Sequence, residues 1–232
     1  MPSINSLFPF RAFMNRGDRP ERRFSTYEEF DINGLDVARW ASIRFEDLRT
    51  HVGYPTARHA SHAITLRTLL RHAWQLRSNV LVFEDDLVIN SDRLGTLELD
   101  NLPEDWKILY FGCLHTEAPV PVSNSLVKVA AALDTHAFGV RCECIPDLLR
   151  LLSPRNVNYR KHPQPTDVRM LDFQREHACY AVFPNAIGQA PLESDINGGV
   201  NLKYHEDCSQ AWNAEVLEGL DMETSPVLLH ET

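Results

Sequence analysis

The clearest pattern in the sequence is a stripe of apolar residues that recurs every three or four positions between residues 57 and 77. The stripe consists of Ala63, Leu66, Leu70 and Ala73, and arginines occupy several of the positions between them. Side chains three and four positions apart lie on one face of an α-helix. The spacing therefore predicts an amphipathic helix over residues 57–77.

Two continuous apolar runs come next, at residues 79–83 (NVLVF) and 107–111 (KILYF). Short runs of this kind are typical of strands that are buried on both faces of a parallel sheet. Weaker patterns predict a helix that starts near Pro20, strands at residues 10–15, 126–131, 136–142 and 179–183, and helices at residues 146–152 and 167–176, the last with Thr166 as its N-cap. Strands that alternate with helices predict an α/β fold with a mostly parallel central sheet flanked by helices.

The bulk composition fits one globular domain. A chain of 232 residues with 44% hydrophobic content has enough apolar material for one core. We expect a single domain over residues 1–196, and we expect residues 197–232 to extend it without an assigned role. The formal net charge of −9 argues against a nucleic-acid partner, because phosphate backbones attract clustered Lys and Arg. The same charge suits a site that gathers carboxylates around a divalent cation.

Cysteine usage and the start of the chain indicate a cytoplasmic protein. The five cysteines are an odd number in irregular positions, unlike the even count of a secreted disulfide framework. Cys142 and Cys144 are spaced for one face of a strand. The first residues lack the features of a signal peptide, and no window approaches the roughly 18 apolar residues that span a bilayer. Peripheral membrane association stays open.

Three adjacent acids, Glu84, Asp85 and Asp86, end the first buried strand. They would repel one another unless a cation or a basic partner lies among them. Ligands of α/β sheets bind at the carboxyl ends of the strands, and Mg²⁺ or Mn²⁺ prefers oxygen ligands. Alternate residues of an extended segment point the same way, so we predict Glu84 and Asp86 as metal ligands and Asp85 as facing a ribose hydroxyl. A solvated turn with three acids is the alternative, and similar strand endings occur in phosphatases and nucleases.

Several short stretches, read in order, resemble glycosyltransferase family 25, which includes lipopolysaccharide and collagen galactosyltransferases. Ser61-His62 followed by residues 80–86 (VLVFEDD) is similar to the family's SH…VLVLEDD block. The other matching stretches are Asn15, residues 19–22 (RPER), 106–112 (WKILYFG), 135–138 (THAF), 165–168 (PTDV) and 180–184 (YAVFP), Gln189 and residues 194–196 (SDI). Together they cover most of the chain in the family's order.

The resemblance implies a nucleotide-binding fold of the GT-A type and a metal-dependent transfer that inverts the sugar carbon. It implies Mn²⁺ or Mg²⁺ as cofactor and a UDP-sugar, with galactose or glucose, as donor. The acceptor would be a glycan, a lipid-linked saccharide or a protein side chain. Inversion needs a base that removes the acceptor's proton, for which Asp167 is the first candidate and Asp195 the second. Both acids also suit the ordinary role of an acid at a helix start.

The resemblance also implies residues that hold the donor. Asn15 is the candidate for binding the nucleobase, Arg22 for the phosphates and Gln189 for a sugar hydroxyl. They join Asp85, which is expected to face a ribose hydroxyl. His136 and His205 are candidate additional metal ligands, whereas we expect His62 to make a structural hydrogen bond. The segment 185–199 contains glycines and is expected to close over the site.

The chain departs from the family pattern at residues 54–58 (YPTAR), where the family shows GEIGC, and at Arg16-Gly17. This departure keeps open a catalytically inactive protein of the same fold that serves as a binding or scaffold module. A metal-dependent phosphohydrolase that uses the same acids is the less favoured alternative. It would release phosphate from simple esters without a sugar nucleotide.

Overall fold

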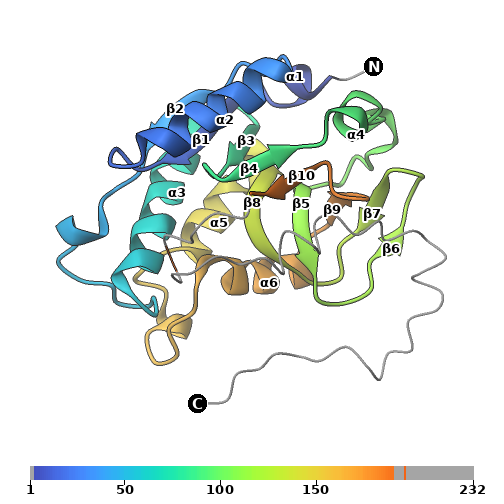
Figure 1. Cartoon of the computed structure of the whole chain (residues 1–232). Helices are drawn as coiled ribbons and strands as arrows, with labels where there is room; N and C mark the ends of the chain where they lie inside the picture. Colours follow the sequence, from blue (N-terminus) through green and yellow to red (C-terminus); the bar gives the residue numbers. More distant parts are fainter. Residues whose placement is uncertain (1–2, 191–195, 197–232) are drawn as a thin grey trace.

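A computed structural model describes residues 3–190 and residue 196 of the chain (Figure 1). Its main sheet has eight strands in the order β2-β1-β3-β8-β5-β9-β7-β6. The strands are β1 (Phe10–Asn15), β2 (Ala38–Ala41), β3 (Val80–Phe83), β5 (Ile108–His115), β6 (Val120–Pro121), β7 (Leu126–Lys128), β8 (Ala132–Val140) and β9 (Cys179–Val182). A second sheet pairs β4 (Leu87–Ile89) with β10 (Ile187–Gln189).

Most strands of the main sheet run in one direction. The pairs β1–β2, β1–β3 and β5–β9 are parallel, whereas β8 is antiparallel to β3 and β5, and β7 is antiparallel to β6 and β9. Only β8 and β7 among these described strands therefore run against the others. The predicted α/β class, with a mostly parallel central sheet flanked by helices, is confirmed.

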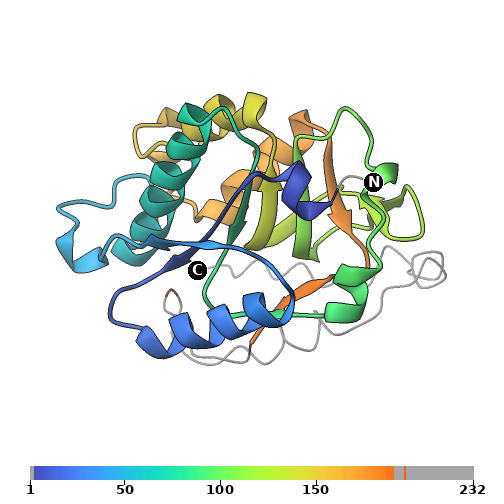
Figure 2. The same cartoon turned by 90° about the horizontal axis from the view of Figure 1, so that it is seen from above.

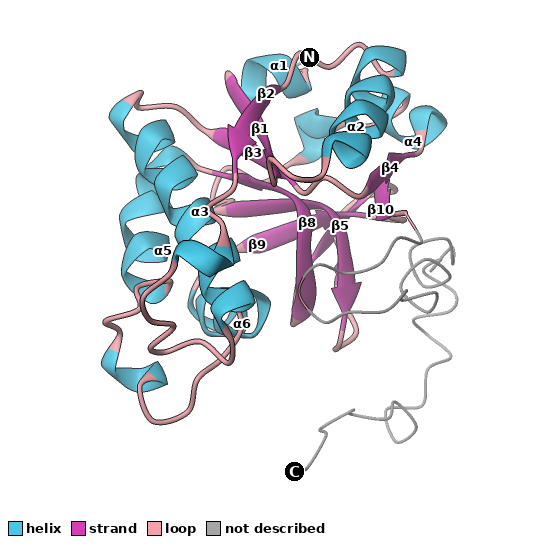
Figure 3. Ribbon diagram, turned by 60° about the vertical axis from the view of Figure 1, so that its left-hand side comes forward, coloured by secondary structure: helices cyan, strands magenta, loops and turns pink. Residues whose placement is uncertain are grey.

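Helices cover both faces of this sheet. The α-helices are α1 (Ile4–Leu7), α2 (Pro20–Ile32), α3 (Ala57–Gln75), α4 (Ser91–Gly95), α5 (Ile145–Leu151) and α6 (Thr166–Glu176), and short 3-10 helices are η1 (Phe45–Asp47), η2 (Leu99–Asn101), η3 (Cys142–Cys144) and η4 (Val157–Tyr159). One core cluster joins α3, α5 and α6 to the sheet, and a second joins α2 and the β4–β10 pair to the opposite face. Figure 2 shows α2 and α3 on opposite sides of the sheet, and Figure 3 shows α3, α5 and α6 together on one side.

Helix α3 forms where its periodicity predicts. Thr56 caps its start by accepting a hydrogen bond from the backbone N–H of His59 at 3.3 Å. The predicted stripe is buried, and Leu66 and Leu70 are fully excluded from solvent. None of the helices in the described part of the chain is both long and apolar enough to cross a membrane.

Two local predictions are wrong. Cys142 and Cys144 lie in the 3-10 helix η3, because β8 ends at Val140 and the chain turns into α5. Thr166 is the first residue of α6, whose N-cap is Pro165 without a side-chain cap. The boundary of β8 also differs, since the strand starts at Ala132. The division at residue 196 stays a prediction, because residues 197–232 lie outside the described residues.

Candidate active site

The acid cluster lies where β3 and β1 end side by side. Their parallel register pairs Phe83 with Phe13, so the residues two positions further on, Asp85 and Asn15, also come together. Nδ2 of Asn15 donates a hydrogen bond of 2.6 Å to Oδ2 of Asp85. Arg39 of β2 in turn donates from Nε to Oδ1 of Asn15 at 2.9 Å. Three neighbouring parallel strands thus bring polar side chains to one edge of the sheet.

The first turns of α2 supply a cation and a hydroxyl to this edge. Nη1 of the buried Arg22 lies 3.3 Å from Oδ1 of Asp85 and 3.8 Å from Oδ2 of Asp86. Thr26, one turn further along the helix, donates its hydroxyl to the backbone carbonyl of Asp85 at 2.9 Å. A basic partner therefore offsets part of the repulsion among the acids.

Asp86 is the acid with the least compensation. Its Oδ1 is buried and has no hydrogen-bond partner among the residues that the structure describes. Burial, together with the negative charges of Glu84 and Asp85, raises the pKa of Asp86 to about 7. Burial also raises the pKa of Asp85, although Asn15 and Arg22 counteract it. A buried carboxylate oxygen without a donor is suited to bind a cation.

Glu84 is held from the other side of the cluster. Nε2 of His62, on α3, lies 3.0 Å from Oε1 of Glu84, and the hydroxyl of Thr135, on β8, donates to the same oxygen at 3.2 Å. Nδ1 of His62 lies 3.3 Å from Oγ1 of Thr166. Burial alone would raise the pKa of Glu84, but the hydrogen bond and charge of His62 outweigh it and lower that pKa.

These contacts bear on the predicted metal ligands, Glu84 and Asp86. Within the described residues, no group of three His, Cys, Asp or Glu side chains is placed to hold a metal ion. A cation that also binds substrate phosphates needs only one or two carboxylates from the protein. Oδ1 of Asp86, without a hydrogen-bond partner in the described part of the chain, fits such a cation, whereas Oε1 of Glu84 already accepts two hydrogen bonds. Both residues stay predicted ligands.

Asp167 approaches the same edge from α6. It is the second residue of that helix, and its Oδ1 accepts a hydrogen bond from the backbone N–H of Val168 at 2.9 Å. Burial alone would lower the pKa of His62, but Glu84 and, to a smaller extent, Asp167 raise it. Asp167 therefore lies within electrostatic reach of the cluster, and its role as a base stays a prediction. Asp195 lies outside the described residues.

Strand β10 carries Gln189 past the cluster. Gln189 pairs with Leu87, the residue after Asp86, and the backbone N–H of Ala190 donates to the carbonyl of Asp86 at 2.6 Å. The structure thus brings Gln189 to the site at which we predict the donor.

His136, a candidate metal ligand, is fully buried on β8. Its Nε2 lies 3.1 Å from the carbonyl oxygen of Ile187, and its Nδ1 has no hydrogen-bond partner within the described part of the chain. One ring nitrogen of His136 is thus within hydrogen-bond distance of a carbonyl oxygen. The predicted role of His136 as a metal ligand stays untested. His205, the other candidate histidine, lies outside the described residues.

Sequence reasoning missed several residues of this site. His62 was expected to make a structural hydrogen bond, and it does so, because its two ring nitrogens contact Thr166 of α6 and Glu84. Its contact with the acid cluster was not predicted. Its position on α3, close to the helix start that faces the carboxyl edge of the sheet, was the available signal. Thr26 and Arg39 gave no signal in the sequence, because long-range pairing alone brings them to the cluster. Thr135 belongs to the stretch THAF of the family resemblance, but its contact with Glu84 was not predicted.

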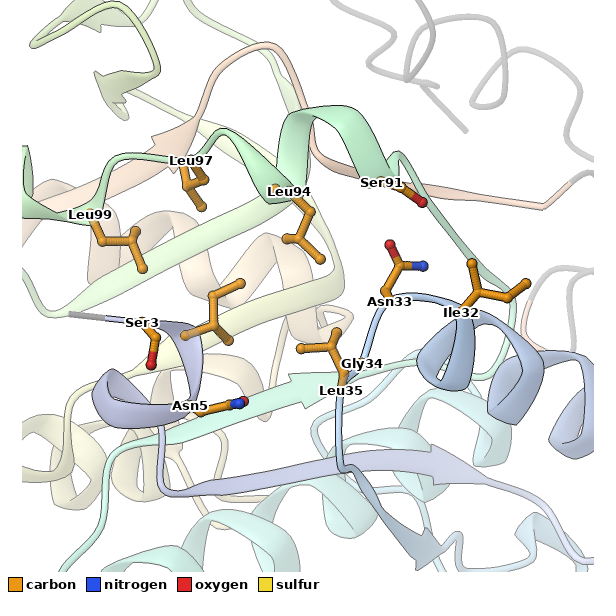
Figure 4. A pocket seen from close by; sticks show the side chains of 12 residues that line it. Ser3, Asn5, Ile32, Asn33, Gly34, Leu35, Ser91, Leu94, Leu97 and Leu99 are labelled. Carbon is orange, nitrogen blue, oxygen red and sulfur yellow. The ribbon is translucent and has the colours of Figure 1, made fainter. Parts of the chain in front are cut away.

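A pocket of about 540 Å³ lies elsewhere, between α1, the end of α2 and α4 (Figure 4). Among the described residues, its lining contains no charged side chain and none of the three acids. Apolar side chains such as Leu35, Leu94 and Leu97 point into it alongside Ser3 and Asn33. The pocket is therefore separate from the candidate active site.

No family model and no curated protein matches this chain. Among solved structures, it is distantly similar to a glycosyltransferase involved in the glycosylation of the major capsid of PBCV-1, with 12% identity and a TM-score of 0.39 over 64% of this chain and 68% of that one. The apo form of the glycosyltransferase GlyE of Streptococcus pneumoniae TIGR4 has 8% identity and a TM-score of 0.47 over 90% of this chain and 62% of that one. The nucleoside-diphosphate-sugar pyrophosphorylase of Vibrio cholerae RC9 has 12% identity and a TM-score of 0.43 over 90% of this chain and 86% of that one. Similarity at this level carries over neither a substrate nor a reaction.

Proposed function

We propose that this chain is a metal-dependent glycosyltransferase of the GT-A type that binds a nucleotide sugar at the acid cluster. The observation that carries the proposal is the buried Oδ1 of Asp86, which has no hydrogen-bond partner among the described residues and lies at the carboxyl edge of three parallel strands, with Arg22 beside it. Asp86, with Glu84 as the second carboxylate, would hold a divalent cation. When bound, this cation neutralises negative charge that develops on the diphosphate leaving group.

The donor-binding residues form a connected group before any ligand binds. Asp85 accepts hydrogen bonds from Asn15 and Arg22, so these three side chains have fixed relative positions. Groups that are fixed in advance lose little freedom when a ligand binds. We assign Asn15 and Asp85 to the nucleoside, Arg22 to the phosphates and Gln189 to the sugar. The resemblance to family 25 makes uridine diphosphate galactose or glucose the expected donor.

The acceptor hydroxyl loses its proton to a carboxylate in this proposal. Asp167 takes that role as first choice, because it lies within electrostatic reach of His62 and hence of Glu84. Asp195 remains the second choice. Attack from the side opposite the diphosphate inverts the sugar carbon, as the resemblance implies. A cytoplasmic location is part of the same proposal.

Thermal denaturation with uridine diphosphate, with and without manganese, tests the donor site. A ligand that binds only the folded state adds about 2.7 kcal/mol of stability at roughly a hundred times its dissociation constant. We expect a manganese-dependent rise in Tm that is lost in Asp86→Ala and kept in Asp31→Asn, an exposed acid on α2.

The alternatives predict other results. An inactive scaffold that has lost the donor site predicts no shift with uridine diphosphate or any other nucleoside diphosphate. A phosphohydrolase predicts release of phosphate from a simple ester such as p-nitrophenyl phosphate, at a rate that falls in the Asp86 variant. Either result contradicts the proposal.

A further inference from the structure

Two loops next to the candidate site are joined into one surface by a buried arginine. Arg169 of α6 is fully excluded from solvent, and its guanidinium lies 3.8 Å from the ring centre of Tyr54 and 4.2 Å from that of Tyr159. It donates hydrogen bonds to backbone carbonyls of both loops, those of Gly53, Ser153 and Gln164. Since neither loop can shift without breaking these bonds, we treat residues 48–56 and 153–165 as one unit, the platform.

Further contacts hold the platform in place. The backbone N–H of Gln164 donates to the carbonyl of Gly53 at 3.3 Å, and the hydroxyl of Tyr54 donates to the carbonyl of Leu152 at 2.5 Å. Gly53 has a φ of +82°, and a Cβ there would come within 3.2 Å of the carbonyl oxygen of Pro154. Close approach of the two loops thus depends on a residue without a side chain.

The exposed charged side chains of the platform are all basic. Between Asp147 and Asp167 the chain contains basic residues and no acid, and residues 48–56 also contain no acid. The exposed basic side chains are Arg49, Arg155, Arg160 and Lys161, with His51 and His162 among them. The chain as a whole carries a net charge of −9, so this surface runs against the overall balance. Clustered charge of one sign attracts ligands of the opposite sign.

The platform leads directly into the candidate site. Its last residue precedes Thr166, whose hydroxyl lies 3.3 Å from Nδ1 of His62. The other ring nitrogen of His62 contacts Glu84. Asp167, the proposed base, follows Thr166 at once, and its charge acts on His59 near the start of α3. A substrate whose hydroxyl reaches Asp167 therefore lies against the platform. Figure 1 shows the two loops on the same side of the molecule, beside the beginning of α3.

We propose that the platform binds the acceptor of the transfer reaction, and that this acceptor is a saccharide with negatively charged groups such as phosphate, sulfate or carboxylate. The assignment as acceptor rests on the proposed function. A nucleic acid fits less well, because Tyr54 and Tyr159 are buried against Arg169 and offer no face on which bases stack. A membrane surface fits less well, because the platform exposes only two large apolar side chains, Val52 and Val157, that could enter a bilayer.

Binding of dextran sulfate, with neutral dextran of the same length as reference, tests the platform by calorimetry at low salt. The platform variant carries Arg155→Gln, Arg160→Gln and Lys161→Gln. The matched control carries Arg71→Gln, Arg77→Gln and Lys128→Gln, which remove the same charge from exposed positions outside the platform. We expect the wild type to bind only the sulfated chain, the platform variant to bind it roughly ten-fold more weakly, and the control to match the wild type within about two-fold.

Two results would overturn the proposal. One is wild-type protein that binds neither polysaccharide, and the other is a control that loses as much affinity as the platform variant. The thermal shift with uridine diphosphate and manganese is measured on the same variants and is expected to persist in both. Loss of that shift in wild type, with platform-dependent binding intact, contradicts the proposed function and leaves an anionic saccharide site.

Discussion

Asn15 and Asp85 share a hydrogen bond of 2.6 Å although they lie 70 positions apart in the sequence. The bond joins the ends of β1 and β3, and Arg39 and Arg22 extend it on either side. A hydrogen bond to a buried charged group contributes more to stability than one between neutral groups. This pair therefore links the stability of the sheet edge to the arrangement of the candidate site.

Asn15→Ala is expected to lower the free energy of unfolding by roughly 1–3 kcal/mol, because it leaves a buried carboxylate oxygen of Asp85 without its donor. Urea denaturation followed by circular dichroism measures the change. Asn101→Ala is the control, since Asn101 is exposed and donates to the exposed Glu98. If the two variants lose equally little stability, the Asn15–Asp85 bond does not have the role given to it here.

Asp86→Asn is expected to stabilise the metal-free protein at neutral pH. The pKa of Asp86 in the folded chain is about 7, above the ordinary value of 3.8, so between these values the folded chain holds more protons than the unfolded chain. The stability of the wild type therefore falls as pH rises through this window. The variant lacks the carboxyl group, so it does not lose this part of its free energy of unfolding as pH rises. The loss in the wild type amounts to about 1.4 kcal/mol per unit of difference between the folded and unfolded pKa.

Chemical denaturation at pH 4 and at pH 8, with a chelator present, checks this prediction. The gap between Asp86→Asn and wild type should be larger at pH 8 than at pH 4. Equal gaps at the two values of pH would mean that the buried carboxyl does not titrate in this window.

Much of the fold was predictable because local signals and burial agree. The run Val80–Phe83 is apolar throughout and forms a fully buried strand, so the acids after it had to emerge at an edge of the sheet. Strand β8 was harder to delimit, because its stretch Asp134-Thr135-His136 is polar and breaks the apolar pattern, although His136 is fully buried. Such burial depends on partners remote in sequence, here the carbonyl of Ile187.

The candidate site was predictable only in part. The three acids lie at the carboxyl edge of the sheet, as expected for residues that follow a buried parallel strand. Asn15 was a donor-site candidate only through the resemblance, and it reaches the same edge because β1 runs parallel to β3. The partner of Glu84 was not predictable, because contact with His62 depends on how α3 packs against the sheet. Thr166 was predicted as a cap, yet its hydroxyl contacts the ring of His62.

Arg169→Lys is expected to destabilise the protein by roughly 2–4 kcal/mol, even though the charge is retained. A lysine offers one ammonium group in place of the planar fork that donates to several carbonyls and lies against two tyrosine rings. Arg175→Lys, an exposed position on the same helix, serves as the control. A loss for Arg169→Lys no greater than that of the control would contradict a structural role for the buried guanidinium.

Gly112→Ala is expected to disturb the contact between β5 and β10. A Cβ at this position would come 1.9 Å from the carbonyl oxygen of Ile187 and 2.3 Å from Nε2 of His136, so these groups must move. Overpacking of this kind costs about 1–3 kcal/mol, which thermal denaturation can measure. Gly95→Ala is the control, because its Cβ would meet no atom of the residues 3–190 and 196 within 4 Å. A Gly112 variant as stable as the control would show that β10 does not lie over β5 in this way.

The proposed function requires that Asp86 bind a divalent cation together with a nucleoside diphosphate. Electron paramagnetic resonance of manganese measures this directly, because the signal of the free ion decreases when the ion binds to protein. We expect the wild type with uridine diphosphate to bind about one manganese ion per chain, beyond what uridine diphosphate binds alone, and we expect Asp86→Asn to abolish this binding. Equal manganese binding by wild type and variant, or no binding by either, would contradict the proposed function.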